Sequence, residues 1–156
     1  MKEIKTAVLY HQLTHTVADG SIKELVAADI WTPQDRVTVI GVALRAHMGL
    51  GTAPALTEGE CACWAELSRI AKMWDAGCIA RAQVQVYWVT ETIDTTKAFG
   101  FCGKWDEESM VMFPSGCGID LDPGDSLYVN ITSFLSILSS GSSVNHGRAI
   151  IYYVER

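Results

Sequence analysis

Apolar and polar residues alternate one by one along most of this chain, which is the pattern of β-strands with one buried face. The strongest strand is predicted at 36–48, RVTVIGVALRAHM, where alternate apolar side chains would share one face: Ile40, Val42, Leu44, Ala46 and Met48. Gly41 lies within this run, and a glycine inside a strand predicts a β-bulge or the close approach of another segment.

Further strands are expected wherever the alternation returns: at 4–11, 80–93, 109–114, 126–137 and 148–156. In 80–93 the residues Ala82, Val84, Val86 and Trp88 are expected to point inward. Two segments fit both the strand period and the helix period, so 22–28 and 60–73 are left open as strand or helix.

Turn-forming residues separate these elements. Asp19-Gly20 predicts a hairpin turn, because both residues tolerate positive φ angles. Loops are expected at 49–59 and 94–108, and the serine- and glycine-rich segment 139–147 is expected to be a hairpin tip.

The sequence pattern thus predicts about eight strands, without alternating helices and without an internal repeat. This predicts an all-β fold, an antiparallel β-sandwich of the jelly-roll type with about eight strands. An immunoglobulin-type sandwich is the alternative, but the Cys…Trp…Cys spacing that marks it is missing. We expect residues 1–156 to form a single domain, with 1–30 as an N-terminal arm or hairpin.

Composition narrows the function classes. The chain has 156 residues, 49% hydrophobic and 19% charged, and a formal net charge of −6. Its lysines and arginines are scattered, so no nucleic-acid partner is predicted. It has no apolar run of the roughly 20 residues that a membrane span needs, so no membrane partner is predicted. The N-terminal segment lacks a signal-peptide pattern, which predicts synthesis in a host cytoplasm.

Mean hydropathy is +0.16, which is high for a freely soluble monomer. Two explanations stay open: a surface covered by another chain, or a large and well-filled core.

The five cysteines are an odd number and lack a C-x-x-C pair, so we expect buried free thiols rather than a zinc site or disulfides: Cys61, Cys63, Cys78, Cys102 and Cys117. His11 and His15 are expected on the solvent face of a strand, and His47 and His146 could meet them only through the fold. A cupin-like enzyme would need an H-x-H pair, which the chain lacks.

Two further features could bind ligands. Asp120, Asp122 and Asp125 surround Pro123-Gly124, and we favour a type II turn there over a metal site, because the corner lacks an extended ligand loop and a distal glutamate. The tryptophans could form a sugar-stacking platform, above all Trp74 and Trp105, which lie in or near expected loops. Packing in a core or interface is the competing interpretation.

The segments WTPQDRVTVIGVALRAHM and GIDLDPGDSLYVNIT, with the terminal RAIIYYVER, resemble small jelly-roll proteins on the surfaces of bacteriophages and other virions. The resemblance covers about residues 30–156 and contains no catalytic or binding motif. It implies a capsid decoration (cement) protein, commonly trimeric, with the major capsid protein as partner. The Pro-Gly-Asp corner also occurs in trimeric jelly rolls of the tumour-necrosis-factor and C1q type.

The resulting hypothesis is a structural protein of the virion, located on the capsid surface, that forms a homotrimer and reinforces a capsid lattice. It is not an enzyme, and no catalytic, cofactor-binding or metal-binding residue is predicted. The alternatives are a carbohydrate- or receptor-binding β-sandwich, such as a tail-fibre tip, and, third, the cupin-like enzyme.

Overall fold

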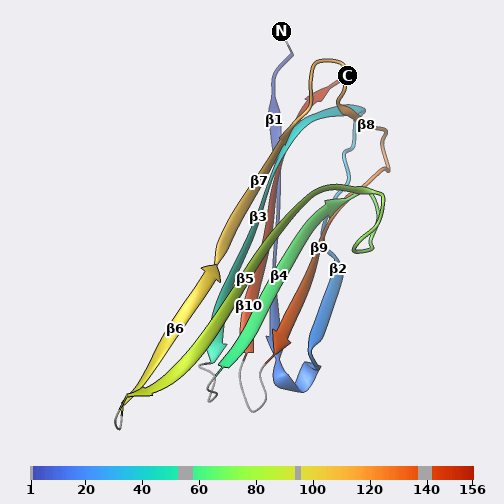
Figure 1. Cartoon of the computed structure of the whole chain (residues 1–156). Coiled ribbons are helices and arrows are strands. Elements are labelled where there is room, and N and C mark those ends of the chain that lie inside the picture. The colour runs from blue at the N-terminus through green and yellow to red at the C-terminus, as the bar shows by residue number, and fades with distance from the viewer. Residues whose placement is uncertain (1, 53–57, 94–95, 137–141) are drawn as a thin grey trace.

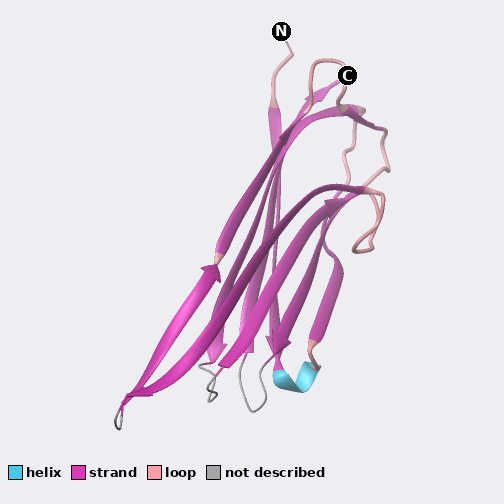
Figure 2. Cartoon of the chain, in the orientation of Figure 1, coloured by secondary structure: helices cyan, strands magenta, loops and turns pink. Residues whose placement is uncertain are grey.

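The computed structural model describes residues 2–52, 58–93, 96–136 and 142–156, the side chains of 50–52, 58–59, 88–93 and 96–104 excepted. Most of these described residues form β-strands, and they contain a single short 3₁₀ turn, η1 (Val17–Asp19), near one end of the molecule (Figures 1 and 2). The strands are β1 (Lys5–Thr16), β2 (Ile22–Trp31), β3 (Val37–Thr52), β4 (Glu58–Ser68), β5 (Cys78–Ile93), β6 (Thr96–Lys104), β7 (Asp106–Met112), β8 (Ile119–Leu121), β9 (Leu127–Ser136) and β10 (Ser142–Glu155).

The strands form two antiparallel sheets. Sheet A has the order β1-β10-β3-β7, with β8 also paired to β3, and sheet B has the order β2-β9-β4-β5-β6. The chain changes sheet at each step from β1 to β4, then between β6 and β7, and again between β8, β9 and β10. The first and last strands are neighbours. This is the jelly-roll sandwich that the alternating pattern predicts, with β6 added in the segment that is expected to be a loop.

The core lies between the inner faces of the two sheets. Leu44, Met48 and Ile151 from sheet A and Leu67 and Ile131 from sheet B are fully buried. Alternation of side chains across each strand brings these residues to the inner face, as expected.

Strand β3 contains the bulge that Gly41 predicts. Tyr152 pairs with Gly41 and Tyr153 with Val39, so Ile40 is left without a partner on β10. The bulge moves the buried face of the strand by one residue: Val39 and Val42 are buried, whereas Ile40 is only half-buried. The expected face of β3 is therefore correct from Val42 to Met48 and wrong at Ile40, because a bulge reverses the alternation.

The hairpin expected at Asp19-Gly20 does not form. β1 pairs with β10 and β2 pairs with β9, so η1 and Gly20 carry the chain from sheet A to sheet B. Residues 5–16 and 22–31 are thus strands of the two sheets, and the role of 1–30 as an arm toward a neighbour stays a prediction.

The expected loops are shorter in the structure. The segment 94–108 contains β6 and the start of β7, and 142–147 belongs to β10. The alternation does not predict these two strand segments, because their polar or glycine-rich sequences lack a continuous apolar face. The two ambiguous segments are strands: β2 covers 22–28, and β4 covers 60–68 and is followed by the 69–77 turn. Residues 53–57, in the loop expected at 49–59, lie outside the described residues.

The corner at Asp122–Asp125 is a turn, as predicted. The Asp125 N–H donates to the Asp122 carbonyl at 3.0 Å, and the Asp125 carboxylate accepts the Asp122 N–H at 2.9 Å. Gly124 has φ +98°, the left-handed value that the third position of a type II turn requires. The Asp122 carboxylate forms an exposed ion pair with Arg36 at 3.0 Å.

None of the described helices is long and apolar enough to cross a membrane.

Candidate interaction surfaces

The outer face of sheet A exposes a band of apolar side chains. The strand register places Val8, Ile150, Ala43 and Met110 in one row across the sheet, and Met112 lies in the next row. Val8, Met110 and Met112 are 60%, 58% and 59% exposed. Val8 lies on β1, and Met110 and Met112 lie on β7, the two edge strands of the sheet. We name these three side chains the apolar band.

Next to the apolar band lies a polar pocket of about 160 Å³. It is lined by residues from three neighbouring strands: Tyr10, Arg45, His47, His146 and Arg148. The register pairs Arg148 with Arg45 and His146 with His47, which places like side chains beside each other across β10 and β3. The fold thus joins His47 and His146, with ring centroids 5.5 Å apart.

Hydrogen bonds and charge define this pocket further. The Tyr10 hydroxyl lies 2.6 Å from Nδ1 of His146. Arg45 binds Asp106 on β7 with both ends of its guanidinium group, and this contact lowers the pKa of Asp106. Burial, together with the charge of His47, lowers the pKa of His146.

The outer face of sheet B carries a second feature, centred on Trp74 in the 69–77 turn. Trp74 is 52% exposed and has φ +61°, a strained value for a bulky side chain. The Arg81 guanidinium lies 4.6 Å from the centre of its ring, and Trp64 meets it edge-on at 5.6 Å. The fully buried Glu66 carboxylate accepts the Trp74 N–H at 3.1 Å and the Arg81 Nε–H at 2.6 Å. We name Trp64, Trp74 and Arg81 the aromatic platform.

Asn130 lies next to Glu66 on the same face and holds the same turn. Its side-chain amide donates to the Ile70 and Lys72 carbonyls, and its oxygen accepts the Ala27 N–H at 2.7 Å. Ala27 has φ +50° and lies in a bulge of β2. Asn130 is fully buried, so the Asn-Ile-Thr sequon is not accessible in the folded chain.

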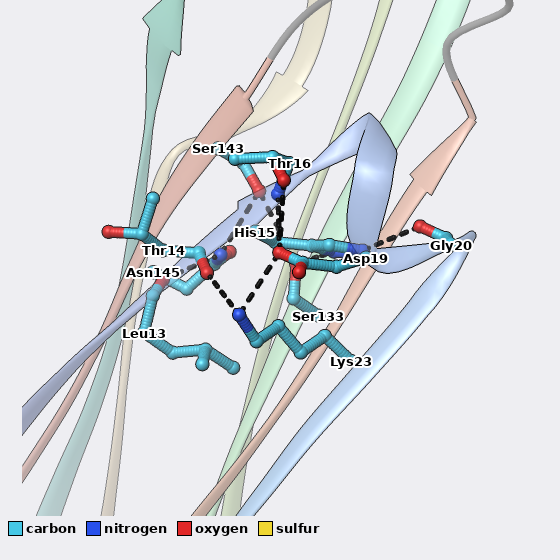
Figure 3. A network of polar contacts seen from close by, with 10 residues as sticks. All are labelled: Leu13, Thr14, His15, Thr16, Asp19, Gly20, Lys23, Ser133, Ser143 and Asn145. Atoms are coloured by element: carbon cyan, nitrogen blue, oxygen red, sulfur yellow. Dashed lines mark hydrogen bonds and ion pairs between the residues drawn. The ribbon is translucent and has the colours of Figure 1, made fainter.

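A third polar group is buried between the sheets and includes His15 (Figure 3). Nε2 of His15 lies 2.8 Å from the Gly20 carbonyl, and Nδ1 lies 2.9 Å from the Ser133 hydroxyl. Since a carbonyl only accepts, Nε2 carries the proton. Ser143 and Asn145 extend this chain of hydrogen bonds to β10. The group fastens the β1–β2 crossover to both sheets.

The expectation that His11 and His15 face solvent is wrong. Both lie on the inward side of β1, where His15 is fully buried and His11 half-buried. The alternation was assigned to the wrong face, because Val8 and Tyr10 are apolar and yet exposed.

Cysteine burial is confirmed for two residues. Cys61 and Cys63 are buried, and burial raises the pKa of each thiol to about 12. Cys78 is half-buried and Cys117 is exposed, and the side chain of Cys102 lies outside the described residues. In the described part of the chain, no three histidine, cysteine or acidic side chains are grouped as metal ligands.

Of the tryptophans singled out by the sequence, Trp74 is exposed, but Trp105 is half-buried and packs against the core. The prediction of an exposed ring is therefore wrong for Trp105. Trp88 is expected to point inward, but its side chain is not among those that the structure describes.

Comparison with known proteins gives structural likeness only. No protein-family model matches the chain, and no curated protein matches it. A decameric BFDV capsid protein superposes with a TM-score of 0.41 at 10% identity, over 99% of this chain and 100% of that one. A structure of the infectious bursal disease virus Gx strain has a TM-score of 0.30 at 9% identity, over 97% and 38%. A tailspike protein of Acinetobacter baumannii phage AM24 has a TM-score of 0.21 at 9% identity, over 94% and 26%.

These three neighbours are a capsid protein, a protein from a virus and a phage tailspike, and none of them is described as a decoration protein. The TM-scores are below 0.5. The argument for function therefore rests on the surfaces of this chain.

Proposed function

We propose that this protein is a structural component of a virion that self-associates through the outer face of sheet A and binds a capsid lattice to reinforce it. The observation that carries the proposal is the apolar band. In this proposal the protein performs no catalysis and contacts neither nucleic acid nor membrane.

The apolar band has the composition of an interface. Methionine and tyrosine are enriched at protein–protein interfaces. On this face Met110 and Met112 are more than half exposed, and Tyr10 is half exposed. Burying such surface contributes about 25 cal/mol per Å². The band therefore provides a driving force for association that an isolated chain leaves unused.

A second copy of this chain suits the same face because the face carries both signs of charge. Arg45 and Arg148 lie in its centre, and Asp106 and Glu108 lie on β7 at its edge. A copy that presents its acidic edge to these arginines would gain complementary charges beside the buried apolar band. The edge strands β1 and β7 also leave backbone groups that can pair with another strand.

The finer features of the proposal follow from the resemblance to virion jelly rolls. They are a homotrimer, a position on the outer surface of a bacteriophage capsid and the major capsid protein as partner. Reinforcement would follow from linkage, since a protein that binds only the assembled shell stabilises it by mass action.

The test is the mass of the protein in solution. The double substitution Val8→Lys and Met110→Lys places charges in the apolar band without touching the core. We expect light scattering to give an oligomer for the unchanged chain and a monomer for this variant. Both positions are exposed, so the thermal unfolding temperature should stay nearly the same.

Gln83→Lys is the matched control, because Gln83 is exposed on β5 of sheet B. It should leave the oligomer intact. A strict monomer for the unchanged chain would refute self-association, and an oligomer that survives the double substitution would refute the assigned face.

A second candidate function is carbohydrate binding at the aromatic platform. The observation that favours it is Trp74, an exposed indole held in a strained backbone conformation by Glu66 and Arg81. Strain of this kind often marks functional sites.

A glycan array tests this candidate. Binding that is lost in Trp74→Ala and kept in Ile70→Ala, an exposed residue of the same turn, would support it. An array without any bound glycan would contradict it and leave the virion proposal unaffected.

A further inference from the structure

The polar pocket on sheet A concentrates hydrogen-bond donors without an acid among its lining residues. Tyr10 comes from β1, His146 and Arg148 from β10, and Arg45 and His47 from β3. A hydroxyl, two imidazoles and two guanidinium groups thus surround a space of about 160 Å³. Such a set of groups favours an anion over a neutral ligand.

The nearest carboxylate does not neutralise the whole pocket. Asp106 is engaged by the fork of Arg45, and the ion pairs among the described residues do not include Arg148. The charge of Arg148 helps to lower the pKa of Asp106, but Arg148 forms no ion pair with Asp106 that would occupy its guanidinium group. Arg148 is therefore the cation available to an incoming anion.

One imidazole nitrogen in the pocket also lacks a partner. Nδ1 of His47 is buried and has no hydrogen bond within the described part of the chain. A buried polar atom without a partner costs about 1–3 kcal/mol, and a hydrogen bond gained when a ligand or water reaches this atom would recover that energy.

We propose that this pocket binds a small tetrahedral oxyanion of the sulfate or phosphate class, and that it binds the anion more tightly at acidic pH. The planar fork of Arg45 already holds a planar carboxylate, whereas the remaining donors come from three neighbouring strands and line one small space, which suits a compact anion with several acceptor oxygens.

A small free anion fits better than a nucleic-acid backbone. The chain carries a net charge of −6, and Asp106 and Glu108 border the pocket on β7. These charges repel a polyanion that must lie across the face, but they leave room for one small ion.

The pH dependence comes from the histidine pair. His146 faces Tyr10 on β1, Arg148 on its own strand and His47 and Arg45 on β3, with Asp106 and Glu108 beyond them on β7. Tyr10 and His146 share a hydrogen bond at Nδ1, in which the Tyr10 hydroxyl donates when neutral His146 carries its proton on Nε2. When His146 gains a proton, Nδ1 becomes the donor, and the Tyr10 proton is free to turn toward the anion. Protonation of His146 at acidic pH therefore adds a positive charge to the pocket and also frees the Tyr10 hydroxyl as a hydrogen-bond donor.

The experiment is calorimetric titration of the full chain with sodium sulfate at constant ionic strength, at about pH 5 and about pH 7.5, the acidic value lying well below the ordinary histidine pKa because burial lowers the pKa of His146. Sulfate keeps its charge over this range, so any change belongs to the protein. We expect binding to be about tenfold tighter at the acidic pH, which corresponds to one unit of pKa shift. Arg148→Gln should abolish binding, and His146→Gln should remove the pH dependence.

Arg69→Gln, in the exposed 69–77 turn, is the control and should bind sulfate as the unchanged chain does. Thermal unfolding without sulfate checks that each variant is folded. Equal affinity at both pH values, or binding that survives Arg148→Gln, would overturn the proposal. Displacement of sulfate by a short single-stranded oligonucleotide, with the same dependence on Arg148, would contradict the small-anion assignment. The inference does not rest on self-association, because sulfate binding and oligomer mass are separate readouts.

Discussion

Glu66 and Arg81 form the strongest polar contact on the outer face of sheet B, and their roles differ. Glu66 is fully buried, while the Arg81 side chain is 42% exposed, so the carboxylate depends on this partner and on the Trp74 N–H for its hydrogen bonds. The strained φ of Trp74 persists because these contacts fix the turn.

We therefore expect Glu66→Gln to destabilise the protein by about 1–3 kcal/mol, because the amide loses the charge that holds Arg81. Urea unfolding measures the difference. Glu24→Gln, at an exposed position of β2, is the control and should change the stability by less than about 0.5 kcal/mol. An equal effect of the two substitutions would contradict the role of Glu66.

Gly118 allows a close approach that a side chain would prevent. A Cβ atom there would lie 2.6 Å from the Val39 carbonyl oxygen, which belongs to the backbone of β3 and cannot move aside. Gly118→Ala should therefore destabilise the fold by about 1–3 kcal/mol in urea unfolding. Gly49→Ala meets nothing within 4 Å and should be close to neutral. A neutral Gly118→Ala would show that β8 does not pack on β3 as described.

At the scale of elements, the crossover from β1 to β2 is held by polar contacts. One oxygen of the Asp19 carboxylate accepts bonds from the Thr16 N–H, the Thr16 hydroxyl and the Lys23 ammonium group, all at 3.0–3.1 Å. These bonds lower the pKa of Asp19 from 3.8 to about 2, the Thr16 N–H having the largest effect.

A carboxylate whose pKa is lower in the folded state stabilises the fold above its unfolded pKa. This contribution is lost as the pH falls from about 4 to about 2. Asp19→Asn should therefore reduce stability at neutral pH and flatten its decline over this acidic range. Thermal unfolding as a function of pH measures it, with the exposed Asp35→Asn as control. Identical acid profiles for the two variants would contradict the assignment.

The elements also show what the sequence could predict. Regular alternation located β3, β5, β9 and β10, since a strand with one buried face leaves that trace. It failed where a bulge at Ile40 reversed the face and where β6 runs through a glycine-rich segment. The alternation also does not determine which strands pair, so the sequence predicts a hairpin at the β1–β2 turn, where the structure has a crossover between the sheets.

The candidate surfaces were harder to predict than the strands. Trp74 was singled out by its place in a loop, but its support by Glu66 depends on contacts made only in the fold. His47 and His146 lie far apart in sequence and meet because β3 and β10 pair. Exposed Val8 looked like a core residue, since hydrophobicity alone cannot distinguish a core face from an interface face.

At the scale of the whole molecule, each sheet of the sandwich presents a different outer face. Sheet A carries the apolar band and the polar pocket, while sheet B carries the aromatic platform, and its paired strands β5 and β6 project beyond the other strands (Figure 1). Two separate faces allow a protein to contact copies of itself with one and another partner with the other. This is the arrangement that the proposed role in a virion needs.

Electron microscopy of the purified chain at high concentration, compared with the Val8→Lys and Met110→Lys double variant, tests this role most directly. Our account predicts closed particles or regular oligomers for the unchanged chain and dispersed single molecules for the variant. Dispersed single molecules for the unchanged chain, with no particle or ordered assembly, would contradict it.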